Sequence, residues 1–243
     1  MTKQTDPWEA FWLASELSTA TGPAFAAQIN DFAPPAGRLR RATYSAAPLP
    51  LVRRADALAD VAGARCSMRA FGAGPLDGSA VGALFTAFAD GPGGRRAWPS
   101  AGGLYPLDIY ALLLDVDHSL HGRAVHYEPD LHGLTDVAAS PSWSRLVPLL
   151  SAEVLETAPQ LVVLFVLDTE LAEARYGNRA GRFALIEVGH AAHGLALRLA
   201  AEGLAGVELG GAHDRALLDV LGLADTPMRL ALAYACGRSA NPG

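Results

Sequence analysis

Two arginines and a serine stand within five residues in the segment Arg65-Cys66-Ser67-Met68-Arg69. Guanidinium forks and a hydroxyl at this spacing suit a phosphate, because their N–H and O–H donors can surround its oxygens at short range. The same residues could also form a solvated charge pair. The segment is therefore a candidate phosphate site that needs support from other parts of the chain.

A second candidate is the segment PSAGGLYP, residues 99–106, which precedes a predicted buried strand. Pro99 fixes the entry of the chain, and Gly102 and Gly103 let backbone amides come close to a flat ligand. An ordinary tight turn is the alternative interpretation.

A third candidate is the run Glu187-Val188-Gly189-His190, inside a strongly apolar segment. A buried carboxylate there costs stability unless it has partners, so Glu187 belongs either to a binding site or to a structural hydrogen-bonded pair. His190 and His193 lie three residues apart beside it. No third ligand is suitably spaced, so we predict no metal site.

Composition excludes several classes of function. The chain has 243 residues, a net charge of −6 and a hydrophobic content of 51%, which predicts a globular protein without affinity for nucleic acid. Lys3 is the only lysine, so a P-loop or Schiff-base site cannot be built. Residues 203–211 do not fit a Rossmann fingerprint. With no membrane-spanning run and two isolated cysteines, we expect a cytoplasmic protein.

The elements that must position these residues mix helices and strands without regular alternation, which predicts an α+β fold with one sheet wrapped by helices. We expect residues 1–50 to form an N-terminal helix, bearing Trp8, Phe11 and Trp12, followed by an extended arm over 31–50. We expect residues 51–243 to form the main domain. The strongest helix is predicted at about 182–204 and is apolar on nearly all faces, which is typical of a buried central helix. Shorter helices are expected from Asp56, Asp77 and Asp214, and strands at 107–114, 125–127, 161–167, 207–209 and 228–236.

The order of these motifs, from R-x-S-x-R through PSAGGLYPLDIY, YGNRAGRFALIEVGHAAHGLAL and GLAGVELGG to ALAYACGR, resembles the nitroreductase-like flavoproteins, specifically the SagB-type dehydrogenases. These include FMN-dependent oxidases that convert thiazolines and oxazolines to thiazoles and oxazoles in natural products. The resemblance covers about residues 50–240. It implies an antiparallel or mixed sheet, a long buried central helix, and a homodimer with FMN at the subunit interface.

The resemblance assigns the candidate residues to parts of FMN. It implies phosphate contacts from Arg65, the backbone of Cys66, Ser67, Arg69 and Arg238. It implies that the isoalloxazine ring is lined by Pro99, Ser100, Gly102 and Gly103, that Glu187 and Gly189 match the central-helix motif, and that Gly206, Leu209 and Gly210 pass near the reactive edge of the ring.

Two departures from the family pattern concern catalysis. Arg175-Tyr176 replaces a lysine–tyrosine pair, and His193-Gly194 replaces a glutamine–asparagine pair. Arginine cannot accept a proton, so we predict that Tyr176 is the catalytic base and that Arg175 activates it, with His190 and His193 as rival bases. We expect a peptide or carrier-bound substrate, with a biosynthetic protein as a further partner. The alternatives are an NAD(P)H-dependent nitro or quinone reductase and a non-catalytic partner of a biosynthetic complex.

Overall fold

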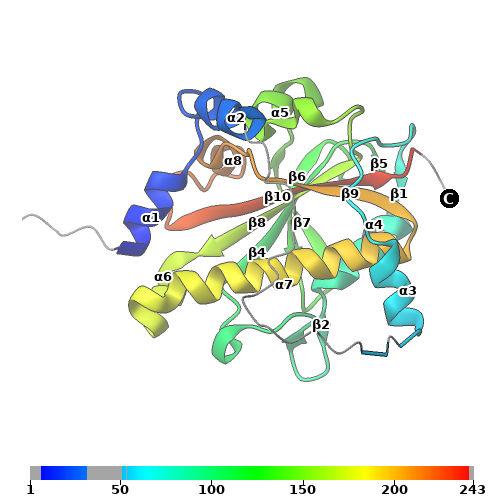
Figure 1. Cartoon of the computed structure of the whole chain (residues 1–243), viewed down its shortest axis with the longest axis horizontal. Coiled ribbons are helices and arrows are strands. Elements are labelled where there is room, and N and C mark those ends of the chain that lie inside the picture. The colour runs from blue at the N-terminus through cyan, green and yellow to red at the C-terminus, as the bar shows by residue number, and fades with distance from the viewer. Residues whose placement is uncertain (1–6, 32–50, 53, 241–243) are drawn as a thin grey trace, which may run out of the picture.

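A six-stranded sheet runs through the computed structural model, which describes residues 7–31, 51–52 and 54–240 (Figure 1). Its strand order is β7-β6-β4-β8-β10-β9, and every neighbouring pair is antiparallel. The strands are β4 (Leu107–Leu113), β6 (Arg123–Glu128), β7 (Gly133–Ala139), β8 (Leu161–Asp168), β9 (Leu204–Leu209) and β10 (Met228–Arg238). Four short strands pair outside this sheet: β1 (Leu76–Asp77) with β5 (Val116–Asp117), and β2 (Asp90–Gly91) with β3 (Arg95–Arg96).

Strand β8 explains why the sheet is covered on both faces. Its side chains alternate between two apolar clusters, with Leu161, Val163 and Phe165 in one and Val162 and Leu164 in the other. Successive side chains of a strand point to opposite faces, so a continuous apolar run indicates a strand buried on both sides. The α+β class predicted from the sequence is confirmed.

Helices cover the two faces unequally. The first face carries α1 (Pro7–Ser15), α4 (Gly78–Phe85) and the long α7 (Ala180–Ala201), and the second carries α5 (Trp143–Leu150) and α8 (Asp214–Val220). The remaining helices are α2 (Gly22–Asp31), α3 (Ala57–Ala64) and α6 (Thr169–Tyr176). Figure 1 shows α7 crossing in front of the strands.

Two of the predicted helix starts are confirmed by their caps. The Asp56 carboxylate accepts the N–H of Ala59 at 3.0 Å at the start of α3. The Asp77 carboxylate accepts the N–H of Ser79 at 2.6 Å at the start of α4. Each bond satisfies one of the donors that a helix leaves without a partner in its first turn.

The prediction that the central helix is buried all round is wrong for one face of α7. Leu185 is 39% exposed and Ile186 is 56% exposed, and Gly189, His190 and His193 are exposed beside them. The sheet covers only the side of the helix that faces it. In the part of the chain that the structure describes, this face of α7, with Leu185 and Ile186, is therefore open to solvent.

The N-terminal helix α1 packs two of its three aromatic side chains into the core. Trp8 and Trp12 are buried at 8% and 6% exposure. A Cβ on Gly181 of α7 would overlap the Trp8 ring, so that glycine lets the indole lie directly on the helix. Only Phe11 of the three is exposed. The arm predicted at 31–50 lies, from residue 32 on, outside the described residues.

Among the helices of the described ranges, none is both long and apolar enough to cross a lipid bilayer.

Candidate functional site

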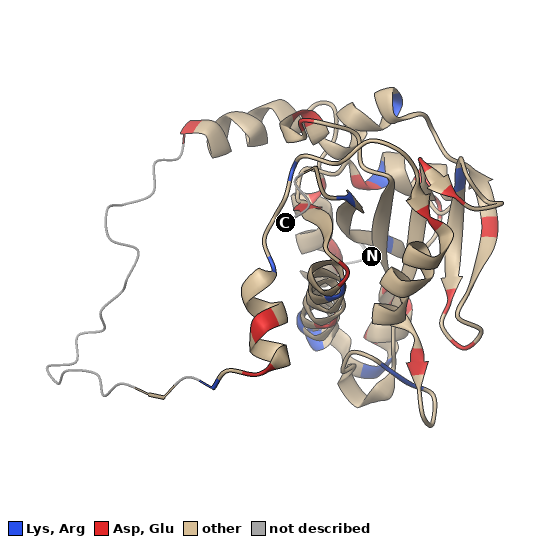
Figure 2. Cartoon of the chain, turned by 90° about the vertical axis from the view of Figure 1, so that its right-hand side faces the viewer, with Lys and Arg blue, Asp and Glu red and all other residues tan. Residues whose placement is uncertain are grey.

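The predicted phosphate segment follows α3 and runs beside the ends of two strands. The N–H of Met68 donates to the carbonyl of Gly206 at 3.0 Å, and the N–H of Gly72 donates to the carbonyl of Arg238 at 2.9 Å. These bonds bring the segment 65–69 and Arg238 to the same end of the sheet, which we call the arginine corner. Figure 2 faces this end of the molecule.

The arginine corner has the donor chemistry of a phosphate site. Ser67, Arg69 and Arg238 are exposed and Arg65 is half-buried. Within the described ranges, no carboxylate lies within 4.0 Å of the guanidinium groups of Arg65, Arg69 and Arg238. Three unneutralised cations and a hydroxyl at one corner fit a phosphate dianion.

Close packing at Gly206 fixes this corner. A Cβ at this position would lie 2.5 Å from Cδ1 of Leu199 on α7 and 2.8 Å from Cε1 of Tyr234 on β10. The strand can therefore approach the C-terminal part of α7 only because residue 206 is glycine. Gly206 was predicted as a site residue from its motif. The physical reason for glycine at this position is its close packing against Leu199 and Tyr234.

The loop at 99–103 is held by the buried carboxylate of Glu187. Glu187 is 2% exposed, and it accepts a hydrogen bond from the Trp98 indole N–H at 3.0 Å and from the Ser100 hydroxyl at 2.5 Å. The Ser100 hydroxyl in turn accepts the backbone N–H of Tyr105 at 2.8 Å. The carboxylate thus fixes both ends of the loop against α7.

Burial is the largest influence on the Glu187 carboxyl. It raises the pKa of Glu187, against the opposing effects of the Ser100 and Trp98 hydrogen bonds and of the Arg96 and His190 side chains. A carboxyl held in this way needs its donors, since a buried polar group without them costs free energy.

The loop also contacts the predicted catalytic pair. Gly102 has a φ of 57°, and a Cβ on it would lie 2.5 Å from Oη of Tyr176 and 2.8 Å from Nη2 of Arg175. The Arg175 guanidinium carbon lies 5.6 Å from the centre of the Tyr176 ring. Tyr176 is the last residue of α6, and Gly177 with a φ of 49° turns the chain toward α7. We call Gly102, Arg175 and Tyr176 with the Ser100–Glu187 pair the loop cluster.

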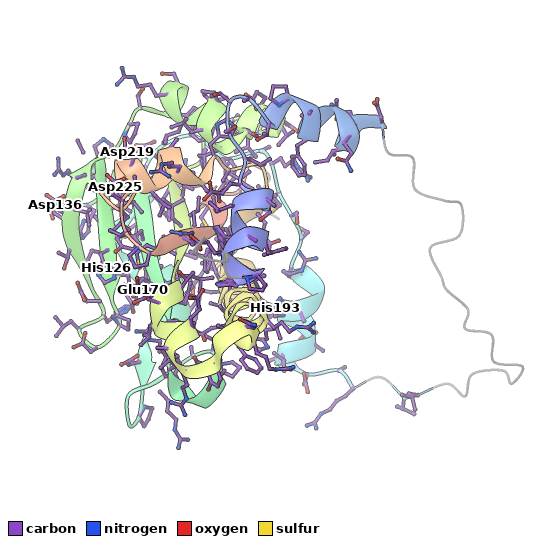
Figure 3. The ribbon with its side chains drawn as sticks, turned by 90° about the vertical axis from the view of Figure 1, so that its left-hand side faces the viewer. His126, Asp136, Glu170, His193, Asp219 and Asp225 are labelled. Carbon is purple, nitrogen blue, oxygen red and sulfur yellow. The ribbon has the colours of Figure 1, made fainter. Side chains whose placement is uncertain are left out.

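The other predicted residues of α7 lie elsewhere. Gly189, His190 and His193 are on the exposed face of the helix, away from the sheet. Figure 3 shows His193 on α7 and His126 among the strands on the far side. Across the described part of the chain, no group of three or more His, Cys, Asp or Glu side chains is arranged to hold a metal ion.

Leu209 and Gly210 line a cavity of about 520 Å³ that the sequence analysis missed. Its roof is formed by the N-terminal helices α1 and α2, including Trp12 and Phe25. Asp214 of α8 also lines it. Nothing in the local sequence pattern indicates that the helices α1 and α2 return to cover the end of β9.

The loop cluster and the arginine corner lie at different points along α7. The loop cluster meets the helix at Glu187, whereas the corner meets it at Ala196, Leu199 and Ala200. Twelve residues of helix, from 187 to 199, correspond to about 18 Å. One chain therefore keeps its predicted phosphate-binding and ring-lining segments apart.

Comparison with known proteins identifies the family. The nitroreductase family model matches residues 62–238, and the chain belongs to this family. A protein of Methanocaldococcus jannaschii that carries the nitroreductase name is 27% identical over 137 residues, which are 56% of this chain and 69% of the relative.

Two solved structures share the fold. A chain of the Escherichia coli microcin synthetase McbBCD complex, solved with truncated pro-MccB17 bound, superposes with a TM-score of 0.69 at 20% identity, covering 96% of this chain and 92% of its own. The NADPH:FMN oxidoreductase of Vibrio harveyi, complexed with NAD+, gives a TM-score of 0.52 at 16% identity, covering 76% of this chain and 70% of its own.

Proposed function

We propose that this chain is an FMN-dependent dehydrogenase that oxidises an azoline or another amino-acid-derived unit during the biosynthesis of a peptide natural product. The observation that carries the proposal is the contact between Gly102 and the Arg175–Tyr176 pair. It puts a hydroxyl and a fixed cation directly on the loop that we assign to the flavin ring. A dehydrogenase needs such a proton-accepting group beside the hydride acceptor.

The arginine corner supplies the donors that FMN requires at its phosphate. Arg65, Ser67, Arg69 and Arg238 would hold the phosphate, with the Cys66 backbone beside them. The flavin, when bound, accepts the hydride, and the protein contributes position and electrostatics. The backbone from Gly206 at the arginine corner to Gly210 at the cavity spans about 13 Å. The ribityl chain of FMN would follow this stretch of backbone.

In this proposal the Tyr176 oxygen takes the acidic proton of the substrate. Arg175 stays protonated and stabilises the negative charge on that oxygen. Glu187 acts through Ser100 and Trp98, because its two hydrogen bonds keep the loop in place.

A homodimer would complete the site. The exposed apolar face of α7, with Leu185 and Ile186, is the surface that we assign to a second copy. The loop cluster of one chain would then face the arginine corner of its partner.

The peptide substrate is proposed from the likeness to a chain of the microcin synthetase complex, which was solved with a truncated pro-peptide. A biosynthetic partner protein is proposed on the same ground. The alternative, an NAD(P)H-dependent nitro or quinone reductase, is favoured by the fold shared with an NADPH:FMN oxidoreductase.

Anaerobic bleaching of the flavin separates these functions. The purified protein is expected to be yellow and to release FMN on denaturation. We expect a thiazoline-containing peptide to bleach the bound flavin within seconds, and NADPH to bleach it at least a hundredfold more slowly. The reverse order would establish the reductase, and a colourless protein that takes up no FMN would leave only a non-catalytic partner.

A further inference from the structure

The cavity above Leu209 and Gly210 is covered on one side by a part of the chain that the family model does not include. The model matches residues 62–238, whereas the roof consists of α1, α2 and their connection, residues 7–31. The volume of about 520 Å³ is within the range of small-molecule sites, which is about 300–1,000 Å³.

Three contacts fix the roof to the rest of the molecule. The Trp8 ring lies on Gly181 of α7. The N–H of Leu17 donates to the Asp214 carboxylate at 3.2 Å. A Cβ on Gly22 would lie 3.1 Å from Nε2 of His213, so the start of α2 lies against that buried imidazole. The roof is therefore a docked element with its own contacts in the core.

The charges of the cavity have one sign. Most of its lining is apolar, including Trp12, Phe25 and Leu209, and the ionisable lining residues are the carboxyl groups of Glu16 and Asp214. None of the lining residues is a lysine or an arginine. Burial, and after it the charge of Glu16, raise the pKa of Asp214.

We propose that this cavity binds an apolar group that bears a protonated amine, and that this group is part of the substrate. A cation between Glu16 and Asp214 would relieve their repulsion, while the ring-lined walls would bury the apolar body. An anionic group is excluded by the same charges. The assignment to the substrate depends on the proposed function, because that function places the flavin beside Leu209 and Gly210.

Three probes of similar shape test the charge preference. The protein, as purified with its cofactor, is titrated with 2-phenylethylamine, 2-phenylethanol and 3-phenylpropionate by calorimetry, with the total tryptophan fluorescence as a second readout. We expect the amine to bind at least tenfold more tightly than the alcohol, and the carboxylate to bind least. Equal affinities for the three probes would overturn the proposal.

Two tryptophan substitutions on α2 test the location. Ala24 lines the cavity, while Ala26 is exposed on the same helix and does not line it. Ala24→Trp should reduce amine affinity at least tenfold and Ala26→Trp should leave it within twofold. Asp214→Asn should bring the amine and the alcohol within about threefold of each other. If the two substitutions change amine affinity equally, the amine binds elsewhere and the proposal is wrong.

The outcomes for the proposed function and for this cavity are distinguishable. If the purified protein contains no FMN but still binds the amine, the proposed function is wrong and the inference of an amine site stands. A protein that holds FMN but does not bind the amine would contradict this inference alone. If Ala24→Trp abolishes dimer formation and the amine does not bind, the cavity is occupied by a second copy of the chain and the inference is wrong.

Discussion

The backbone of Gly102 lies directly against the hydroxyl of Tyr176, so closely that a Cβ on residue 102 would stand 2.5 Å from the phenolic oxygen. The two residues are 74 positions apart in the sequence. Their contact joins the glycine-rich loop to the end of α6 and leaves no room between them for a side chain. The pair therefore provides a direct test of whether the loop and Tyr176 work together.

Gly102→Ala should reduce turnover by at least tenfold and destabilise the fold. Gly103→Ala is the matched control, because both glycines have positive φ, 57° and 66°, but the space around Gly103 is open. Alanine in the left-handed backbone conformation lowers the free energy of unfolding of both variants by about 1–2 kcal/mol. Only Gly102→Ala also displaces Tyr176. Thermal unfolding and single-turnover flavin reduction measure the difference. Identical behaviour of the two variants would contradict the functional contact.

Glu187→Ala should lower the free energy of unfolding by about 2–4 kcal/mol, because it leaves the donors of Trp98 and Ser100 without their acceptor in a buried place. It should also lower FMN content, since the loop at 99–103 loses its attachment to α7. Glu170→Ala, an exposed acid on α6 that Figure 3 labels, should stay within about 0.5 kcal/mol of wild type. Urea unfolding and flavin absorbance check both effects.

Arg65→Ala should weaken FMN binding by about ten- to a hundredfold, because one charge-assisted hydrogen bond contributes about 1.5–3 kcal/mol. Arg54→Ala is the control: its guanidinium is 89% exposed and pairs with Asp56 at 3.2 Å, just before α3. Fluorescence titration of the apoprotein with FMN measures both. If the two variants bind FMN equally, Arg65 is not a phosphate ligand.

Local sequence patterns predicted the parts of the fold whose cause is local. The caps at Asp56 and Asp77, and the buried strand β8, follow from residue type and periodicity alone. The edge strand β7 was not predicted, because its exposed residues, such as Asp136 and Val137, do not form a clear alternation. Strands of this kind are defined by their neighbour more than by their own pattern.

The site divides in the same way. The segments of the arginine corner and of the loop could be selected from the sequence because their residue types indicate a chemistry, and their roles stay predictions. The cavity roof was missed because it depends on the contacts of Trp8 with Gly181 and of Leu17 with Asp214. These contacts join residues more than 170 positions apart, a separation at which no pattern in the sequence indicates a contact.

Tyr176→Phe should slow single-turnover flavin reduction by about 10²–10⁴-fold at saturating substrate, the usual contribution of a general base. The Tyr176 ring packs edge-on against Phe183 at 5.0 Å between centres, and phenylalanine preserves this contact, so FMN occupancy should not change. His190→Gln and His193→Gln, on the exposed face of α7, test the rival bases. A Tyr176→Phe rate within a few-fold of wild type would assign the base to a histidine or to the acidity of the substrate.

Asp214→Asn should make the protein more stable at neutral pH. Burial raises the pKa of Asp214 from 3.8 to about 6, so the folded state holds the proton more tightly than the unfolded state. The stability that this proton provides is fully present below about pH 4 and is lost as the pH rises through 6. Asparagine is uncharged throughout and can still accept the N–H of Leu17.

The free energy of unfolding of Asp214→Asn relative to wild type should therefore rise between pH 4 and pH 7.5, by about 2–3 kcal/mol, since one pKa unit corresponds to about 1.4 kcal/mol. Urea titrations at several pH values measure this change. Asp225→Asn is the control, because that carboxylate is 97% exposed in its pair with Arg215 and should show a pH-independent difference. A flat profile for Asp214→Asn would mean that the carboxyl group is solvated in solution and that the roof formed by α1 and α2 does not close over it.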